Sequence, residues 1–134
     1  YRVAYNKGVV RLVTFEGEGE PLSSTGKVAF VYAGYDFTNG NISNSTLFVT
    51  NDRSMAENAK LVLSDDSVFE TAEADLDGND LIEGLRLGLQ GVKAGEDCYI
   101  LFTGKYGFGK RGFGTIPANA SLAYYVHIVS IQND

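Results

Sequence analysis

Cysteine is almost absent from this 134-residue chain, so an internal disulfide is excluded. The single cysteine, Cys98, lies in the strand-like segment DCYILF and is expected to be a buried, inert thiol. No apolar run approaches the length of a membrane-spanning helix, so we expect no membrane span within this chain. Positive charge is also scarce, and the net charge of -6 argues against binding to nucleic acid or to an anionic membrane.

Side chains for metal binding or nucleophilic catalysis are scarce too. His127 is the only histidine and lies within a predicted strand, with no partner placed beside it for a metal site or a catalytic triad. Residues 75–79 (DLDGN) echo a calcium-binding loop, but Asp80 stands where that loop needs glycine and Arg86 where it needs glutamate. A well-formed EF-hand is therefore excluded, and weak calcium binding stays open. We predict no metal site and no cofactor.

One glycine-rich segment has the spacing of a nucleotide-binding motif. Residues 107–112 (GFGKRG) fit the pattern G-x-G-x-x-G. Such a loop binds a dinucleotide only where a helix follows it, because the helix N-terminus holds the pyrophosphate. Here Ile116, Pro117 and a predicted strand follow, so we do not assign nucleotide binding to this segment.

The distribution of β-branched and aromatic residues predicts a mainly β domain. Strands are expected at residues 2–5, 9–16, 28–35, 46–50, 97–103 and 122–131. A short helix is expected where Leu81, Leu85 and Leu89 recur at helical intervals, with Asp80 and Glu83 at capping-box spacing. A helix this short is not stable alone and must pack on a sheet. We therefore predict one α+β domain over residues 1–134, with an antiparallel sheet curled around one short helix.

Three segments match, in order, the motifs of one known family. The C-terminal run GFG…IPANASLAYYVHIVSI is similar to an aromatic-Gly loop, an Ile-Pro-x-Asn-Ala-(Ser/Thr)-Leu segment and a final strand. GLRLGLQGVKAGE is similar to that family's helix and Gly-Glu turn, and VAFVYAGYDFTNG to its first hairpin. Together they resemble an FKBP-type peptidyl-prolyl isomerase domain over most of the chain.

The resemblance implies cis-trans isomerisation of Xaa-Pro bonds in proline-containing peptides or proteins, with macrolide-type ligands as further partners. Rotation about that bond must cross about 18–20 kcal/mol, because resonance stiffens it. An apolar pocket can hold the proline and exclude water, which favours the less polar twisted amide. The 8 tyrosines and 8 phenylalanines suit this chemistry, which needs aromatic walls and a few hydrogen-bond donors.

Matching the family's pocket position by position gives two groups of candidate site residues. The catalytic candidates are Tyr32, Phe108 and Ile82, whose backbone N–H is expected to bind a substrate carbonyl. The substrate-binding candidates are Ile42, Ser43, Leu81, Leu85, Phe113, Ile116 and Tyr124.

Several candidates depart from the family pattern. Ile42 stands where phenylalanine is usual, and Ser43 where the family commonly has an aspartate that polarises the pocket. Leu85 replaces a floor tryptophan, and Phe108 lacks the hydroxyl of the family's loop tyrosine. A second interpretation therefore stays open, in which the same fold binds peptides, unfolded chains or a partner protein with little or no catalysis.

The segment at residues 51–67 is longer than the corresponding segment of the family pattern. We expect an insertion at the pocket rim or a surface excursion, with a short helix capped by Asp52 or Ser54 and running through Met55 to Leu63. A domain without ligand would be favoured if this insertion covered the pocket. The Asn/Ser/Thr-rich, cysteine-poor composition and the absence of an initiator Met are compatible with a bacterial periplasm or cell envelope.

Overall fold

The computed structural model describes residues 2–61, 69–79, 81–112, 116–117 and 119–133. Within these ranges an antiparallel sheet has the strand order β1-β2-β6-β7-β3-β4, and β5 also pairs with β3. The strands are β1 (Arg2–Asn6), β2 (Val9–Phe15), β3 (Lys27–Asp36), β4 (Leu47–Thr50), β5 (Ala72–Asp75), β6 (Asp97–Phe102) and β7 (Leu122–Gln132). The helices are α1 (Arg53–Asn58) and α2 (Glu83–Gly88), with 3₁₀ turns at Gly104–Tyr106 and Gly109–Arg111. The predicted α+β class is confirmed.

Strand β3 organises the sheet because three strands pair with it. β7 runs along one side, while β5 and β4 share the other side. Between β5 and β4, the side chain of Asn51 takes the place of a strand partner. It accepts a hydrogen bond from the Tyr32 N–H (2.7 Å) and donates to the carbonyls of Phe30 (3.1 Å) and Glu70 (2.9 Å). These bonds satisfy backbone groups that neither flanking strand reaches.

Helix α2 covers the inner face of the sheet, the face on which Phe30 and Ile100 are buried in the main core. Two glycines bring it close to β6. A Cβ at Gly84 would lie 2.4 Å from the ring of Phe102, and one at Gly88 would lie 2.3 Å from Ile100 Cγ2. Larger residues at these positions would push the helix off the strand, so close packing requires both glycines.

The start of α2 differs from the predicted capping box. Ile82 is the N-cap and makes no side-chain capping bond, so the helix begins at Glu83. Asp80 lies outside the described residues. Glu83 instead forms an ion pair with Arg86 on the first turn of the helix, an arrangement that adds modest stability.

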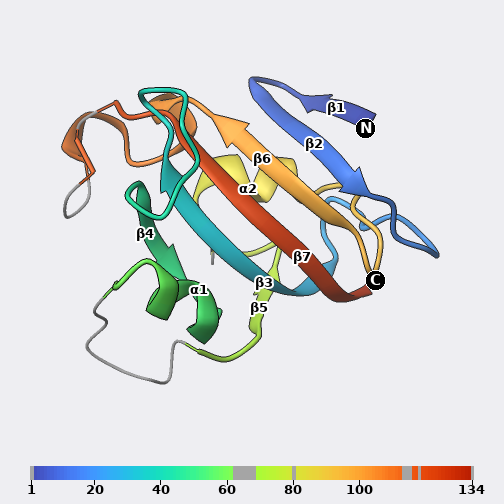
Figure 1. Ribbon diagram of the computed structural model, residues 1–134. Helices are drawn as coiled ribbons and strands as arrows, with labels where there is room; N and C mark the ends of the chain where they lie inside the picture. Colours follow the sequence, from blue (N-terminus) through green and yellow to red (C-terminus); the bar gives the residue numbers. More distant parts are fainter. Residues whose placement is uncertain (1, 62–68, 80, 113–115, 118, 134) are drawn as a thin grey trace.

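Helix α1 lies on the outer face of the sheet, opposite α2 (Figure 1). Asp52 caps it as predicted, because its Oδ1 accepts hydrogen bonds from the N–H groups of Ser54 (2.9 Å) and Met55 (3.2 Å). The helix ends at Asn58, and Leu63 lies outside the described residues. Neither helix of the described chain is long and apolar enough to cross a membrane.

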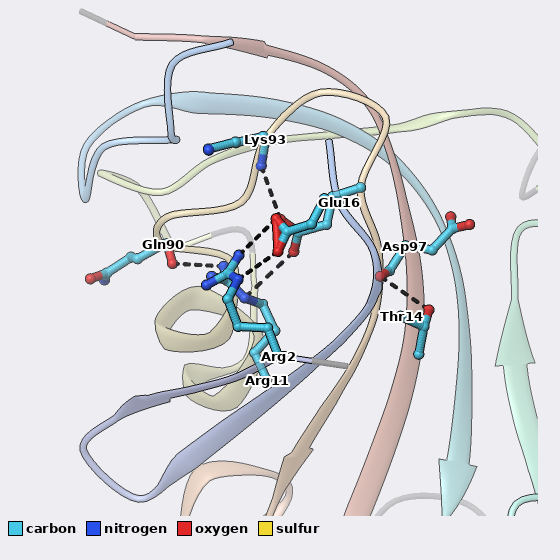
Figure 2. A network of polar contacts seen from close by, with 8 residues as sticks. Arg2, Arg11, Thr14, Glu16, Gln90, Lys93 and Asp97 are labelled. Atoms are coloured by element: carbon cyan, nitrogen blue, oxygen red, sulfur yellow. Dashed lines mark hydrogen bonds and ion pairs between the residues drawn. The ribbon is translucent and has the colours of Figure 1, made fainter. Parts of the chain in front are cut away.

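A buried ion pair ties β2 to the loop before β6 (Figure 2). Arg11 and Glu96 are 5% and 0% exposed, and Arg11 Nε lies 3.5 Å from Glu96 Oε2. Arg11 Nη1 donates to the Gln90 carbonyl (3.0 Å), and the Lys93 N–H donates to Glu96 Oε1 (3.4 Å). Burial raises the pKa of Glu96 and also that of the neighbouring Cys98 thiol, which is 0% exposed. The predicted buried thiol is confirmed.

Candidate functional site

A pocket of about 370 Å³ opens on the inner face, between β3, β4, β5, α2 and the loop after β6. Its lining is almost wholly apolar and aromatic. The lining residues are Phe30, Tyr32, Phe48, Val49, Ala72, Glu73, Ala74, Leu81, Ile82, Leu85, Phe108 and Tyr124. The pocket therefore gathers six predicted site residues, namely Tyr32, Leu81, Ile82, Leu85, Phe108 and Tyr124.

Three of the other four predicted site residues lie in the described structure and do not line this pocket. Ile42 is 39% exposed in the loop between β3 and β4. Ser43 lies in the same loop, where its N–H donates to Thr46 Oγ1 (3.1 Å). Ile116 is 5% exposed and belongs to the main core. Phe113 lies outside the described residues.

Strand β4 supplies two pocket residues that sequence matching missed, Phe48 and Val49. The pairing of β3 with β4 shifts register, so that Val49 lies opposite Gly34 while Leu47 lies opposite Tyr35. A bulge of this kind changes which way side chains point, and here two consecutive residues reach the pocket. A strand was predicted at residues 46–50, but the bulge and the length of the preceding loop leave no signal in the sequence.

Tyr124 holds the aromatic wall together. Its ring stacks on Phe102 with centroids 6.0 Å apart and planes at 12°. Phe48 lies edge-on to it, with centroids 6.0 Å apart, and also edge-on to Phe108 at 6.1 Å. Tyr32 lies 6.3 Å from Tyr124. These are favourable tilted and stacked geometries for aromatic pairs, so strands β3, β4 and β7 and the loop after β6 share one rigid wall.

Close packing at Gly34 fixes the position of the Tyr124 ring. A Cβ at Gly34 would lie 2.8 Å from both Tyr124 Cε2 and Val49 Cγ1. The ring therefore crosses β3 where there is no side chain. This places Val49 against Tyr124, so an aliphatic group lies beside this end of the pocket.

Two of the lining side chains, Tyr32 and Tyr124, carry phenolic hydroxyls. Burial raises the pKa of Tyr32 and of Tyr124, and in Tyr124 the nearby Tyr32 adds to the effect. Both therefore stay protonated at neutral pH and can donate hydrogen bonds. Neither hydroxyl is hydrogen-bonded to any residue of the described chain. A ligand in the pocket can accept from them without displacing a protein partner.

Backbone and charged groups lie at the edge of the pocket. Ile82 has an extended backbone as the N-cap of α2, and no described residue accepts from its N–H. Among the lining residues that the structure describes, Glu73 alone carries a formal charge, and its side chain is exposed. A substrate carbonyl can therefore meet a backbone donor while the interior of the pocket stays uncharged.

The described part of the predicted insertion lies away from this pocket. α1 packs its Met55 and the following Ala59 against Ala33, Tyr35 and Leu47 on the outer face. None of residues 51–61 lines the pocket. The expectation of a rim position is therefore wrong for these residues, because their apolar side chains have a second cluster to pack on. Residues 62–67 lie outside the described ranges.

No cluster of three or more metal-ligating side chains occurs among the described residues. His127 pairs instead with Asp97 on the outer face, at 2.5 Å between Nδ1 and Oδ1. The hydroxyl of Tyr125 donates to the same oxygen at 3.3 Å. These groups are half-buried on the outer face of the sheet and do not line the pocket.

Comparisons with known proteins agree with this architecture. In curated proteins, the chain is 34% identical over 62 residues to FK506-binding protein 1B of Aspergillus fumigatus, covering 46% of this chain and 52% of that protein. It is 39% identical over 54 residues to FK506-binding protein 1 of Yarrowia lipolytica, covering 40% of this chain and 50% of that protein. The matches span about half the length of these relatives.

Solved structures with the same fold cover nearly the whole chain. The three FKBP domains of wheat FKBP73 match 98% of this chain and 49% of theirs, with a TM-score of 0.73 and 21% identity. FkpA from Escherichia coli matches 97% of this chain and 51% of its own, with a TM-score of 0.70 and 23% identity. The predicted FKBP-like fold is thereby confirmed. The family model for FKBP-type peptidyl-prolyl cis-trans isomerases matches residues 27–129, and the chain belongs to that family.

Proposed function

We propose that the inner-face pocket catalyses cis-trans isomerisation of Xaa-Pro bonds in peptides or folding proteins. The observation that carries this proposal is that all three predicted catalytic residues, Tyr32, Ile82 and Phe108, line one apolar pocket. Its volume of about 370 Å³ is in the range of small-ligand sites. The matches to isomerases of this family support the same reaction class.

The mechanism requires exclusion of water and orientation of the substrate. The proline ring lies against the aromatic wall, with Leu85 beneath it. Because the twisted amide has lost resonance, it is less polar than the planar ground state and is favoured in a dry site. The Ile82 N–H donates to a substrate carbonyl, and the hydroxyls of Tyr32 and Tyr124 supply further donors. No covalent step takes place.

We infer that Phe48 and Val49, rather than Ile42 and Ser43, take the positions of the family's phenylalanine and polarising aspartate. Phe48 lies edge-on to Tyr124 and Phe108, as a pocket wall residue should. Val49 lies beside it on the bulged strand and lines the pocket. With an aliphatic residue in place of the aspartate, we expect catalysis to rest on desolvation and neutral donors, and to be slow.

The apolar lining of the pocket also favours a second candidate function, a binding module with little turnover. Val49, Leu85 and Phe108 leave a pocket suited to apolar ligands. Two relatives are named FK506-binding proteins, so macrolide-type ligands belong among the expected occupants. Both functions predict peptide binding, and turnover separates them.

The deciding experiment follows the exchange of short Xaa-Pro peptides by NMR, with the residue before proline varied. We expect acceleration over the uncatalysed rate that is lost in Tyr32→Ala. Binding of the same peptides is measured by fluorescence anisotropy, with circular dichroism to show that the variant is folded. Binding without acceleration for any peptide would replace the isomerase proposal with the binding module. Neither binding nor acceleration would contradict both.

A further inference from the structure

A second hollow, of about 400 Å³, lies beside the pocket across strand β5. It is formed where β5, β3 and β7 run side by side, over the small side chains of Ala29 and Ser130. Glu73 and Ala74 of β5 line both this hollow and the pocket. β5 pairs only with β3 among the described strands. On its other edge the Asp75 carbonyl accepts a hydrogen bond from the Gly78 N–H (3.0 Å), so the added-strand position is the one at Glu73. The two hollows therefore share β5 as a common wall.

The backbone of Glu73 faces that other edge of β5. The Leu76 N–H donates to the Gly26 carbonyl (2.9 Å), which sets the alternation of the β3–β5 ladder. In an antiparallel pair, every second residue directs both backbone groups at its partner. Ala72 and Ala74 are therefore directed at β3, and Glu73 is directed away from it. No described residue bonds to the Glu73 N–H or carbonyl.

The side chain of Glu73 gives this edge its charge. Glu73 pairs across the ladder with Ala29, and its exposed carboxylate stands at the second hollow, which Lys27 and Asp75 also line. An exposed carboxylate next to unpaired backbone groups complements an extended chain that carries a basic side chain. The net charge of -6 adds long-range attraction for such a chain.

We propose that the substrate segment beside the Xaa-Pro bond lies along the open edge of β5 as an added strand. It pairs with the backbone of Glu73 and places a lysine or arginine against the Glu73 carboxylate. β5 has four residues, so at roughly 3.3 Å per residue the basic side chain lies within about four residues of the proline. This rests on the proposed function and narrows the substrate class to extended, basic proline-containing chains.

The test compares matched nine-residue peptides with one Xaa-Pro bond and either Lys or Glu at each flanking position in turn. The value measured by NMR exchange at low salt is the ratio of kcat/KM for the Lys and Glu members of each pair. We expect a ratio of five or more at one position, which falls toward one in Glu73→Gln and below one in Glu73→Lys. The matched control is Glu57→Gln, an exposed glutamate on α1, which should keep the wild-type ratio.

Strand pairing is tested separately by N-methylation of the flanking residue, which removes its N–H. We expect at least a threefold loss of kcat/KM, and an unchanged value would contradict the added strand. If the Lys/Glu ratio of kcat/KM is near one at every position while the peptides are still isomerised, this inference is overturned and the proposed function stands. If wild-type protein accelerates no peptide, the proposed function fails. Binding constants of the Lys and Glu peptides then test this inference alone. Tighter binding of the Lys peptide that is lost in Glu73→Gln would support it, and equal binding would contradict it.

Discussion

Buried polar groups serve opposite purposes in two regions of this protein. Beside α2, Arg11 and Glu96 are charged, almost fully buried and held by neighbouring backbone groups (Figure 2). In the pocket, the hydroxyls of Tyr32 and Tyr124 are neutral and have no partner within the described chain. Leaving a buried charge unpaired is far more unfavourable than leaving a neutral hydroxyl open to solvent or ligand. The ion pair thus stabilises the fold, while the hydroxyls remain available to a substrate.

Breaking the ion pair is expected to have the largest effect on stability. Glu96→Ala leaves Arg11 buried without its counter-charge, which costs about 3–5 kcal/mol of unfolding free energy. Urea unfolding measures the loss. Glu16→Ala is the control, because Glu16 pairs with Arg2 on the exposed surface and such pairs contribute under about 1 kcal/mol. Similar losses of unfolding free energy in the two variants would show that the buried pair stabilises the fold no more than the exposed pair does.

Removing the bridge between β4 and β5 should lower both stability and activity, because Asn51 bonds the backbone of Tyr32, which lines the pocket. Asn51→Ala leaves the Tyr32 N–H and the Phe30 carbonyl without a partner, and we expect a loss of about 1–3 kcal/mol in unfolding free energy. We also expect a weaker kcat/KM in the folded variant, since Tyr32 is held by that bond. Asn58→Ala, on the exposed side of α1, should change neither value.

Removing a pocket hydroxyl should affect activity and leave stability alone. Tyr124→Phe deletes one donor with no protein partner, so we expect kcat/KM to fall about fivefold, the equivalent of roughly 1 kcal/mol. Thermal unfolding should show an unchanged or slightly higher Tm. The matched control is Tyr125→Phe, on the neighbouring residue of β7, whose hydroxyl donates to Asp97 on the outer face. Equal kcat/KM values in wild type, Tyr124→Phe and Tyr125→Phe would show that the Tyr124 hydroxyl does not contribute to catalysis.

The smallest predicted effect is a pH dependence of stability that comes from Glu96. Burial raises its pKa above the ordinary value for a glutamate, so the folded carboxyl holds its proton more tightly than the unfolded one. The stability that comes from this tighter proton binding is complete below the usual glutamate pKa of about 4.3 and is lost as pH rises through the folded pKa, while the ion pair with Arg11 offsets part of the loss. We expect the unfolding free energy of wild type minus that of Glu96→Gln to fall as pH rises over this window. A difference that increases with pH would mean that the charge of Arg11 lowers the pKa of Glu96 more than burial raises it.

Local chemistry made much of the fold predictable from sequence. The long β-branched runs of β3 and β7 form strands wherever they find a partner. Asp52 caps α1 because its carboxylate reaches two N–H groups within three residues. The start of α2 was misplaced, because capping-box spacing at Asp80 and Glu83 does not guarantee that a box forms. Packing of Gly84 on Phe102 fixes that helix instead.

Long-range geometry explains what the sequence could not reveal. β5 has the sequence AEAD, with few strong strand formers, and it is a strand because β3 offers it a ladder. Phe48 and Val49 reach the pocket because a bulge in β4 turns both toward it. Matching to the family indicated Ile42 and Ser43 for two pocket positions that we propose Phe48 and Val49 take, because a longer loop is invisible until the register is known. Residues set by local motifs, such as Tyr32 and Ile82, were located directly.

The aromatic pocket with Phe48 in its wall is the proposed isomerase site. The most direct measurement is NMR exchange of one Xaa-Pro peptide in the presence of wild type, Phe48→Ala and Ile42→Ala, each shown to be folded. We expect acceleration by wild type and Ile42→Ala, with at least a tenfold loss in Phe48→Ala. Loss of activity in Ile42→Ala with Phe48→Ala still active would contradict the assignment, and so would equal activity in all three proteins.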